Sequence, residues 1–209
     1  MDHTILTIGR QFGSGGRIIG MKLAKALNIS FYDKELITLA ARESGLCPEV
    51  FEQADERASA GFSHTFSLGM PYLGGVCMPS ADILSNEGLF KIQSDVIRKL
   101  AETESCVIVG RCADYILRDH PACISFFIHD KLPNRVRRIA ERLQRPVEQS
   151  KELILKTDKS RAAYYDYYTN KTWGMSSSYN FSIDASLLGI DETVCFMKNF
   201  IERKLKPGK

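Results

Sequence analysis

Hydrophobic residues follow two spacings along the chain, and these spacings predict where strands and helices lie. Thr4–Ile8 is a short β-branched run that predicts a strand, and Ile29–Asp33 predicts a second one. Between them, Ile18–Asn28 places apolar residues four positions apart, which predicts a helix with one buried face. This order predicts a strand, a glycine-rich loop, a helix and a second strand parallel to the first, joined by a right-handed crossover.

The rest of the chain continues this alternation. Helices are expected at 34–44, 89–102, 132–143, 147–168 and 191–205, and strands at 106–109, 123–128 and 180–183. Strands that alternate with helices favour a three-layer α/β fold with a mostly parallel sheet. Between Gly45 and Asn86 the periodicity weakens, and an uncharged segment rich in glycine, serine and aromatic residues predicts a mobile or partner-packed loop region.

Composition limits the class of protein. With 209 residues, 44% hydrophobic content and a formal net charge of +3, the chain fits one globular domain and excludes a disordered or collagen-like protein. The uncharged stretch Ala58–Ala81 holds glycines, prolines and His64, so no membrane span is expected.

The N-terminal residues lack a signal-peptide pattern, which predicts a cytoplasmic location. Six cysteines without zinc spacing predict reduced, mostly buried thiols.

Positive charge concentrates in one part of the chain. Lys131 to Arg161 holds ten basic and four acidic residues. On the predicted helix 132–143, four arginines fall within an arc of about 80° beside an apolar face. They are Arg135, Arg138, Arg142 and Arg145. Two interpretations stay open: a polyphosphate lies against this cationic face, or the arginines extend over a solvated surface.

The loop between the first strand and the first helix is the most informative segment. Gly13, Ser14, Gly15 and Gly16 let the backbone curl so that successive N–H groups face one point, and the helix N-terminus adds partial positive charge. Arg17 ends the loop with a cation. The pattern favours a phosphate cradle over the alternative, a tight turn without a ligand.

The loop departs from the Walker A consensus in either register. Setting its glycines on the consensus GxGK puts Gly16 at the phosphate-binding lysine and Arg10 at the first glycine. A shift by one residue puts Arg17 at the lysine, but leaves Gln11 for the first glycine and Ile18 for the magnesium-binding hydroxyl. We therefore expect Arg17 to supply the charge of the missing lysine.

Four ordered motifs together resemble one known family. RQFGSGGR, FYDKELI, VIVGRCADYIL and TDKSRAAYY, followed by a tryptophan and a Tyr-Asn pair, look like the cytidylate kinase-like family over nearly the whole chain. The resemblance implies a P-loop NTPase fold with a parallel five-stranded sheet and flanking helices, in a single domain spanning 1–209. It also implies a nucleoside monophosphate-binding insertion at about 34–88 and a helical lid at about 131–161.

Individual motif positions suggest binding residues. Gly-Arg-Asp in the relatives contacts the nucleoside monophosphate; here Arg111 matches, Cys112 takes the aspartate position, and Asp114 is the candidate carboxylate. Asp158 and Arg161 match an Asp-x-x-Arg pair that reads the cytosine edge and clasps phosphate in the relatives. Spacing alone favours a helical ion pair, and the family resemblance reverses this preference.

Other family positions differ. The carboxylate that helps to hold magnesium in the relatives is Val109 here, and an arginine before the Asp-x-x-Arg pair is Ile154. No set of metal-ligating side chains is therefore predicted. We expect Mg²⁺ to bind through phosphate oxygens and water, with Asp33 or Asp130 as outer-shell partners.

The resulting hypothesis is transfer of the ATP γ-phosphoryl group to a nucleoside monophosphate, best CMP or dCMP. The expected groups are a donor site of Gly13, Ser14, Gly15, Gly16, Arg17 and Arg138; an acceptor site of Asp33, Arg111, Asp114, Asp158 and Arg161; and catalytic charges on Arg17, Arg111, Arg142 and Arg161. Two alternatives stay open, namely a nucleotide-binding sensor without turnover and a kinase of a non-nucleotide metabolite. Neither nucleic acid nor a membrane is an expected partner, and the oligomeric state is undetermined.

Overall fold

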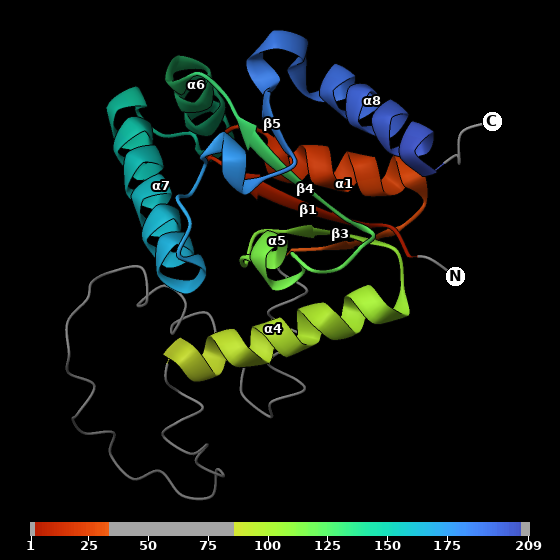
Figure 1. The fold of residues 1–209 in the computed structure, drawn as a ribbon. Coiled ribbons are helices and arrows are strands. Elements are labelled where there is room, and N and C mark those ends of the chain that lie inside the picture. Colours follow the sequence, from red (N-terminus) through yellow and green to blue (C-terminus); the bar gives the residue numbers. More distant parts are fainter. Residues whose placement is uncertain (1–2, 34–85, 206–209) are drawn as a thin grey trace, which may run out of the picture.

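A computed structural model describes residues 3–33 and 86–205 of the chain (Figure 1). Its strands are β1 (Ile5–Arg10), β2 (Ser30–Tyr32), β3 (Cys106–Val109), β4 (Cys123–His129) and β5 (Phe181–Asp184). Its helices are α1 (Gly16–Leu27), α4 (Asn86–Thr103), α5 (Ala113–Ile116), α6 (Leu132–Leu143), α7 (Val147–Thr169), the 3-10 turn η1 (Ser176–Ser178) and α8 (Ala185–Leu205). The predicted helix 34–44 and nearly all of the predicted loop region and insertion lie outside the described residues.

The five strands form one parallel sheet in the order β2-β3-β1-β4-β5. Side chains of β1 alternate between its faces because the strand repeat is two residues. Ile5 packs with residues of α4 and α5, while Leu6 and Ile8 pack with residues of α1 and α8. Figure 1 shows these two helix pairs on opposite faces of the sheet. The expected three-layer α/β P-loop fold is therefore confirmed.

Helices α6 and α7 pack against each other at the end of the sheet away from both chain termini (Figure 1). Val136 and Ile139 of α6 bury their side chains against Ile154 of α7, and Phe12 of the glycine-rich loop packs on the same cluster. This packing holds the basic segment beside the carboxyl ends of the strands. The prediction that it forms a lid stays a prediction.

Element boundaries differ from the sequence-based ones where tertiary pairing extends or breaks a pattern. Strand β1 runs two residues further than predicted because Arg10 still pairs with Ile128 of β4. The last helix begins at Ala185 and is broken at Gly189, whose φ of 74° is left-handed. Four-residue α5 is too short to show periodicity in the sequence.

Other sequence-based expectations concern thiols and membrane spans. Cys106 and Cys112 are buried free thiols, whereas Cys195 is exposed. No helix in the described ranges has the length and apolar character needed to cross a membrane.

Candidate active site

A pocket of about 730 Å³ lies where the loops after β1 and β3 meet α6 and α7. Among the described residues, its charged lining consists of six arginines and two aspartates. These are Arg10, Arg17, Arg111, Arg138, Arg142, Arg161, Asp33 and Asp114. The pocket therefore carries a large excess of positive charge, which favours an anionic ligand.

The glycine-rich loop forms one wall of this pocket. Gly13 and Gly15 have φ of 80° and 88°, a left-handed conformation that glycine adopts without steric cost. Ser14 is fully buried, and its Oγ accepts a hydrogen bond from the Gly16 amide at 3.3 Å. Within the described part of the chain, no group accepts a hydrogen bond from the Gly13 or Gly15 amides. The loop thus has amides at the N-terminus of α1 that could donate to an anion.

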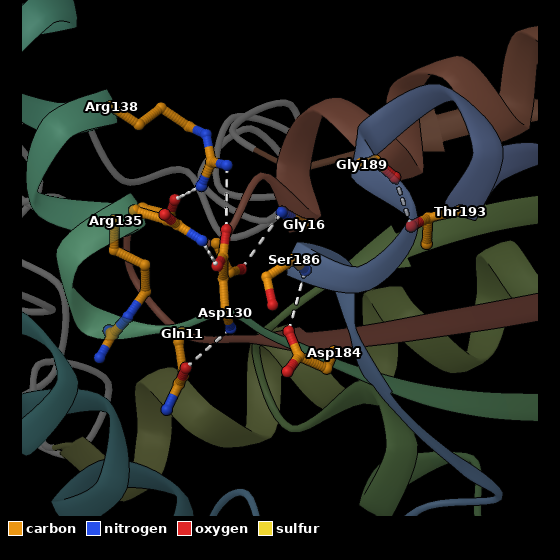
Figure 2. Close-up of polar contacts among 12 residues, drawn as sticks. Gln11, Gly16, Asp130, Arg135, Arg138, Asp184, Ser186, Gly189 and Thr193 are labelled. Atoms are coloured by element: carbon orange, nitrogen blue, oxygen red, sulfur yellow. Dashed lines mark hydrogen bonds and ion pairs between the residues drawn. The ribbon is translucent and has the colours of Figure 1, made fainter.

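Asp130 positions Arg138 over this loop (Figure 2). The Asp130 side chain is fully buried and accepts hydrogen bonds from Arg138 Nη2 and Asn134 Nδ2, both at 2.9 Å. Arg138 also donates to the Gly13 carbonyl oxygen, and the Asp130 amide donates to Gln11 Oε1 at 3.2 Å. These contacts connect the start of α6 with the loop. They also occupy the Asp130 carboxylate that was expected as an outer-shell partner of magnesium.

Arg161 of α7 lines the pocket beside Arg10 and Phe12. Its Nη1 donates to the Arg10 carbonyl oxygen at 3.0 Å, and its guanidinium stands 5.4 Å from the Phe12 ring centroid. Burial, followed by the positive charge of Arg10, lowers the pKa of Arg161 to about 9, and Arg111 acts in the same direction. The side chain is still charged at neutral pH, and an anion between these guanidinium groups would relieve their repulsion.

Arg142 approaches Phe12 from the other helix. Its guanidinium lies 5.4 Å from the same ring centroid, so the Phe12 ring contacts cations from both α6 and α7. Arg145 is exposed beyond the end of α6 and is not among the residues that line the pocket. The predicted cationic face of α6 is therefore divided between the pocket, a buried ion pair of Arg135 and the solvent.

Asp158 lies outside the pocket, unlike the other expected acceptor residues. One of its carboxylate oxygens accepts from the Phe12 amide at 2.7 Å, and the other binds Arg135 Nη1 at 2.5 Å. Its partner Arg135 is 6% exposed. Asp158 thus connects α7 to the loop and to α6. Both carboxylate oxygens of Asp158 thus have partners within the protein, and its role in reading the base stays a prediction.

Asp33 lies between two arginines at the end of β2. Arg17 Nε donates to one carboxylate oxygen at 2.7 Å, and Arg10 Nη2 lies 3.6 Å from the other. The Arg17 side chain is half-exposed and stands 5.8 Å from the Phe31 ring centroid. Asp33 therefore orients both cations at the rim of the pocket.

The loop after β3 has an unusual backbone. Gly110, Arg111 and Cys112 are successive left-handed residues, with φ of 84°, 59° and 54°. For a residue with a side chain this conformation costs about 1 kcal/mol or more, so the surrounding fold must hold Arg111 in place. The loop presents Arg111 to the pocket, as the family motif implies for an acceptor phosphate.

Asp114 lies at the aromatic end of the pocket. Tyr165 Oη donates to its carboxylate at 2.7 Å, and Tyr164, Trp173 and Tyr179 line the same end. Burial raises the pKa of Asp114, only partly offset by the hydrogen bond from Tyr165. A carboxyl group that gains a proton easily can both donate and accept toward a ligand.

Asp114→Asn is expected to stabilise the ligand-free protein near neutral pH. Because the folded state raises this pKa, the native protein binds the proton more tightly than the unfolded chain, and wild-type stability falls as pH rises through that range. Asparagine does not titrate. The Tm of the variant should exceed that of wild type at about pH 8, and the difference should shrink toward about pH 4. Exposed Asp119→Asn is the control; a difference that grows at low pH contradicts the assignment.

Sequence reasoning missed two groups of this site. It noted Arg10 only as a departure from the consensus, and it gave Phe12 no role although the ring meets two guanidinium groups. The Phe12 contacts arise from helices more than a hundred residues further along the chain, so no local signal revealed them. In the described ranges, no cluster of three or more histidine, cysteine or acidic residues is present that could hold a metal ion.

Comparison with known proteins places the chain in a family. The model of the cytidylate kinase-like family matches residues 5–187. A crystal structure of an uncharacterized protein from Eubacterium ventriosum ATCC 27560 is 30% identical, with 96% of this chain and 99% of that chain covered and a TM-score of 0.69. A search of curated proteins finds no significant match.

More distant solved structures share the fold. Shikimate kinase from Bacteroides thetaiotaomicron is 16% identical, with 95% of this chain and 98% of that one covered and a TM-score of 0.56. A gluconokinase from Sinorhizobium meliloti 1021 is 14% identical, with 97% and 93% covered and a TM-score of 0.53. At these identities the likeness concerns the fold alone. Together with the family match, it supports a P-loop kinase.

Proposed function

Because the chain belongs to the cytidylate kinase-like family, we propose that it transfers the γ-phosphoryl group of ATP to a nucleoside monophosphate. CMP and dCMP are the first acceptors to consider, since the family resemblance implies them. The observation that carries the proposal is the convergence of arginines from β1, α1, the loop after β3, α6 and α7 on one pocket whose described lining includes only two aspartates.

Each part of the pocket has a task in this reaction. The amides of the glycine-rich loop bind the β-phosphate of ATP, with Arg138 held beside them by Asp130. Arg111 and Arg161 bind the acceptor phosphate. Arg142 and Arg17 neutralise charge on the transferring group from α6 and from the first turn of α1. Bound Mg²⁺ would add charge neutralisation at the phosphate oxygens, and Asp33 would serve it through water.

The reaction requires alignment rather than a covalent intermediate. The bond between the γ-phosphorus and its bridging oxygen breaks to release ADP, while an acceptor phosphate oxygen forms a new bond to that phosphorus. Guanidinium groups from different elements hold the two anions in line. The aromatic end of the pocket, with Trp173 and Tyr164, offers surfaces for the base or sugar of the acceptor.

ADP release tests this function over a panel of acceptors. The purified protein is supplied with ATP, Mg²⁺ and either a nucleoside monophosphate or a small hydroxylated metabolite, and kcat/KM is measured for each. The highest value is expected for CMP or dCMP. A metabolite that exceeds all the nucleotides would make the protein a metabolite kinase, and ATP binding without turnover of any acceptor would make it a sensor.

A further inference from the structure

Arg10, the last residue of β1, lies beside the glycine-rich loop. In the Walker A register set by the glycines, the chain has Gly16 at the lysine position and Arg10 at the position of the first glycine. These two departures from the consensus are six residues apart in the sequence, and the structure places the two positions against each other. This observation rests on the proposed function only for the identity of the ligand, the phosphates of ATP.

Arg10 occupies the space that a side chain at position 16 would need. A Cβ on Gly16 would lie 2.6 Å from Cβ of Arg10 and 3.2 Å from its Cγ. Contacts below 3.0 Å essentially never occur for real Cβ atoms. Only one of the two positions can therefore carry a long side chain in this backbone conformation.

The Arg10 side chain then crosses a second glycine. A Cβ on Gly110 would lie 2.1 Å from Nη1 of Arg10 and 3.1 Å from its Cζ. Gly16 follows β1 and Gly110 follows β3. Because neither glycine has a side chain, both leave room for the side chain of Arg10. This path brings the guanidinium into the pocket, where Nη2 lies 3.6 Å from Asp33 and the side chain is 20% exposed.

Arg10 lies among other cations that line the pocket, including Arg17 and Arg161. Asp33 is shared with Arg17, which holds it more closely, at 2.7 Å. The positive charge of Arg10 contributes to the lowered pKa of Arg161, so the two guanidinium groups repel each other across the pocket. A phosphate between them would offset both charges.

We propose that Arg10 supplies the phosphate-binding charge that a lysine at position 16 supplies in a Walker A loop. Arg10 then compensates for the lysine that is missing at position 16. The cation extends from the strand before the loop instead of from the helix after it. Arg17, favoured on sequence grounds, stays at the rim with Asp33 and acts as an auxiliary cation.

Reversing the exchange tests this assignment. Arg10→Gly and Arg10→Gln remove the charge, the second while keeping most of the stem and its packing. Gly16→Lys alone is expected to disturb the loop because its Cβ meets Arg10. In the double variant Arg10→Gly/Gly16→Lys this clash is gone, and the Cβ of Ile128, at 3.2 Å, must give by only a few tenths of an ångström.

Two readouts are measured for each variant, ATP affinity by calorimetry without acceptor and kcat with the best acceptor. Arg10→Gln and Arg10→Gly should each lower kcat by about a hundredfold and weaken ATP binding, whereas Arg17→Ala should cost less than about tenfold. The double variant should recover at least about tenfold over Arg10→Gly. Exposed Arg137→Ala is the surface control and should match wild type.

The results separate this assignment from the proposed function. Wild-type ATP affinity in Arg10→Gln, or a larger loss in Arg17→Ala than in Arg10→Gln, overturns the role of Arg10. A folded double variant that performs no better than Arg10→Gly overturns the exchange. If wild type binds ATP but phosphorylates no acceptor, the proposed function fails, while the ATP affinities still decide the role of Arg10.

Discussion

Arg161→Ala is expected to lower kcat/KM by about a hundredfold to a thousandfold, because it removes the charge that we propose binds the acceptor phosphate. The residue is well placed for this effect. Its guanidinium is buried, lies against Phe12 and is repelled by Arg10 and Arg111 in the absence of an anion. The same repulsion means that the ligand-free variant should lose little stability, since removing the charge relieves it.

Two measurements check this expectation. Steady-state kinetics with ATP and the best acceptor give the loss in kcat/KM, and thermal unfolding with and without ligand separates folding from binding. Arg161→Lys should recover part of the rate, because it keeps the charge but not the planar pair of donors. Arg137→Ala, an exposed arginine of α6, is the matched control. An Arg161→Ala variant with wild-type kinetics would exclude Arg161 from the site.

Asp158→Ala is expected to lower the free energy of unfolding by roughly 3 kcal/mol, because it leaves the nearly buried Arg135 without its carboxylate. The Phe12 amide loses its acceptor in the same variant. The loop should loosen where it meets α7, and ATP affinity should fall as a consequence. Base recognition by Asp158 predicts a different result, namely an unchanged fold with altered selectivity among nucleoside monophosphates.

A double variant distinguishes the ion pair from the carboxylate itself. Arg135→Met/Asp158→Leu replaces both charges by apolar side chains of similar volume and should recover much of the stability lost in Asp158→Ala. Chemical denaturation of the three proteins measures these differences. An Asp158→Ala protein as stable as wild type, with changed acceptor selectivity, would restore the interpretation that Asp158 reads the base.

Much of the fold could be predicted because its signals are local. Helix α6 was predicted from Leu132 to Leu143, as observed, because its apolar residues repeat with the helical period. In the structure, Lys131 precedes the helix and the left-handed residue Gln144 ends it. The tight turn between β1 and α1 could be predicted from its glycines, because glycine adopts the φ of Gly13 and Gly15 without steric cost. The role of this loop as a phosphate cradle stays a prediction.

The partners of the charged residues depended on the tertiary structure. Sequence spacing places Asp158 beside Arg161 on one helix, yet the packing of α6 on α7 pairs Asp158 with Arg135 and leaves Arg161 in the pocket. The helical period places Arg135 and Arg138 on one cationic face of α6, but the two bind different carboxylates. Arg135 pairs with Asp158 and Arg138 with Asp130. Spacing fixes which face a side chain occupies, whereas the opposing element decides what it meets.

By itself, the sequence determined the order of strands and helices, the glycine-rich loop and the presence of many arginines near it. Only the tertiary structure decided where the side chain of Arg10 lies. Gly16 and Gly110 are 94 positions apart in the sequence, and they leave room for the same side chain only when β1 and β3 pair and Arg10 passes both glycines. Steric exclusion between distant segments has no local signal in the sequence, so the relation between Arg10 and these glycines becomes visible only in the folded protein.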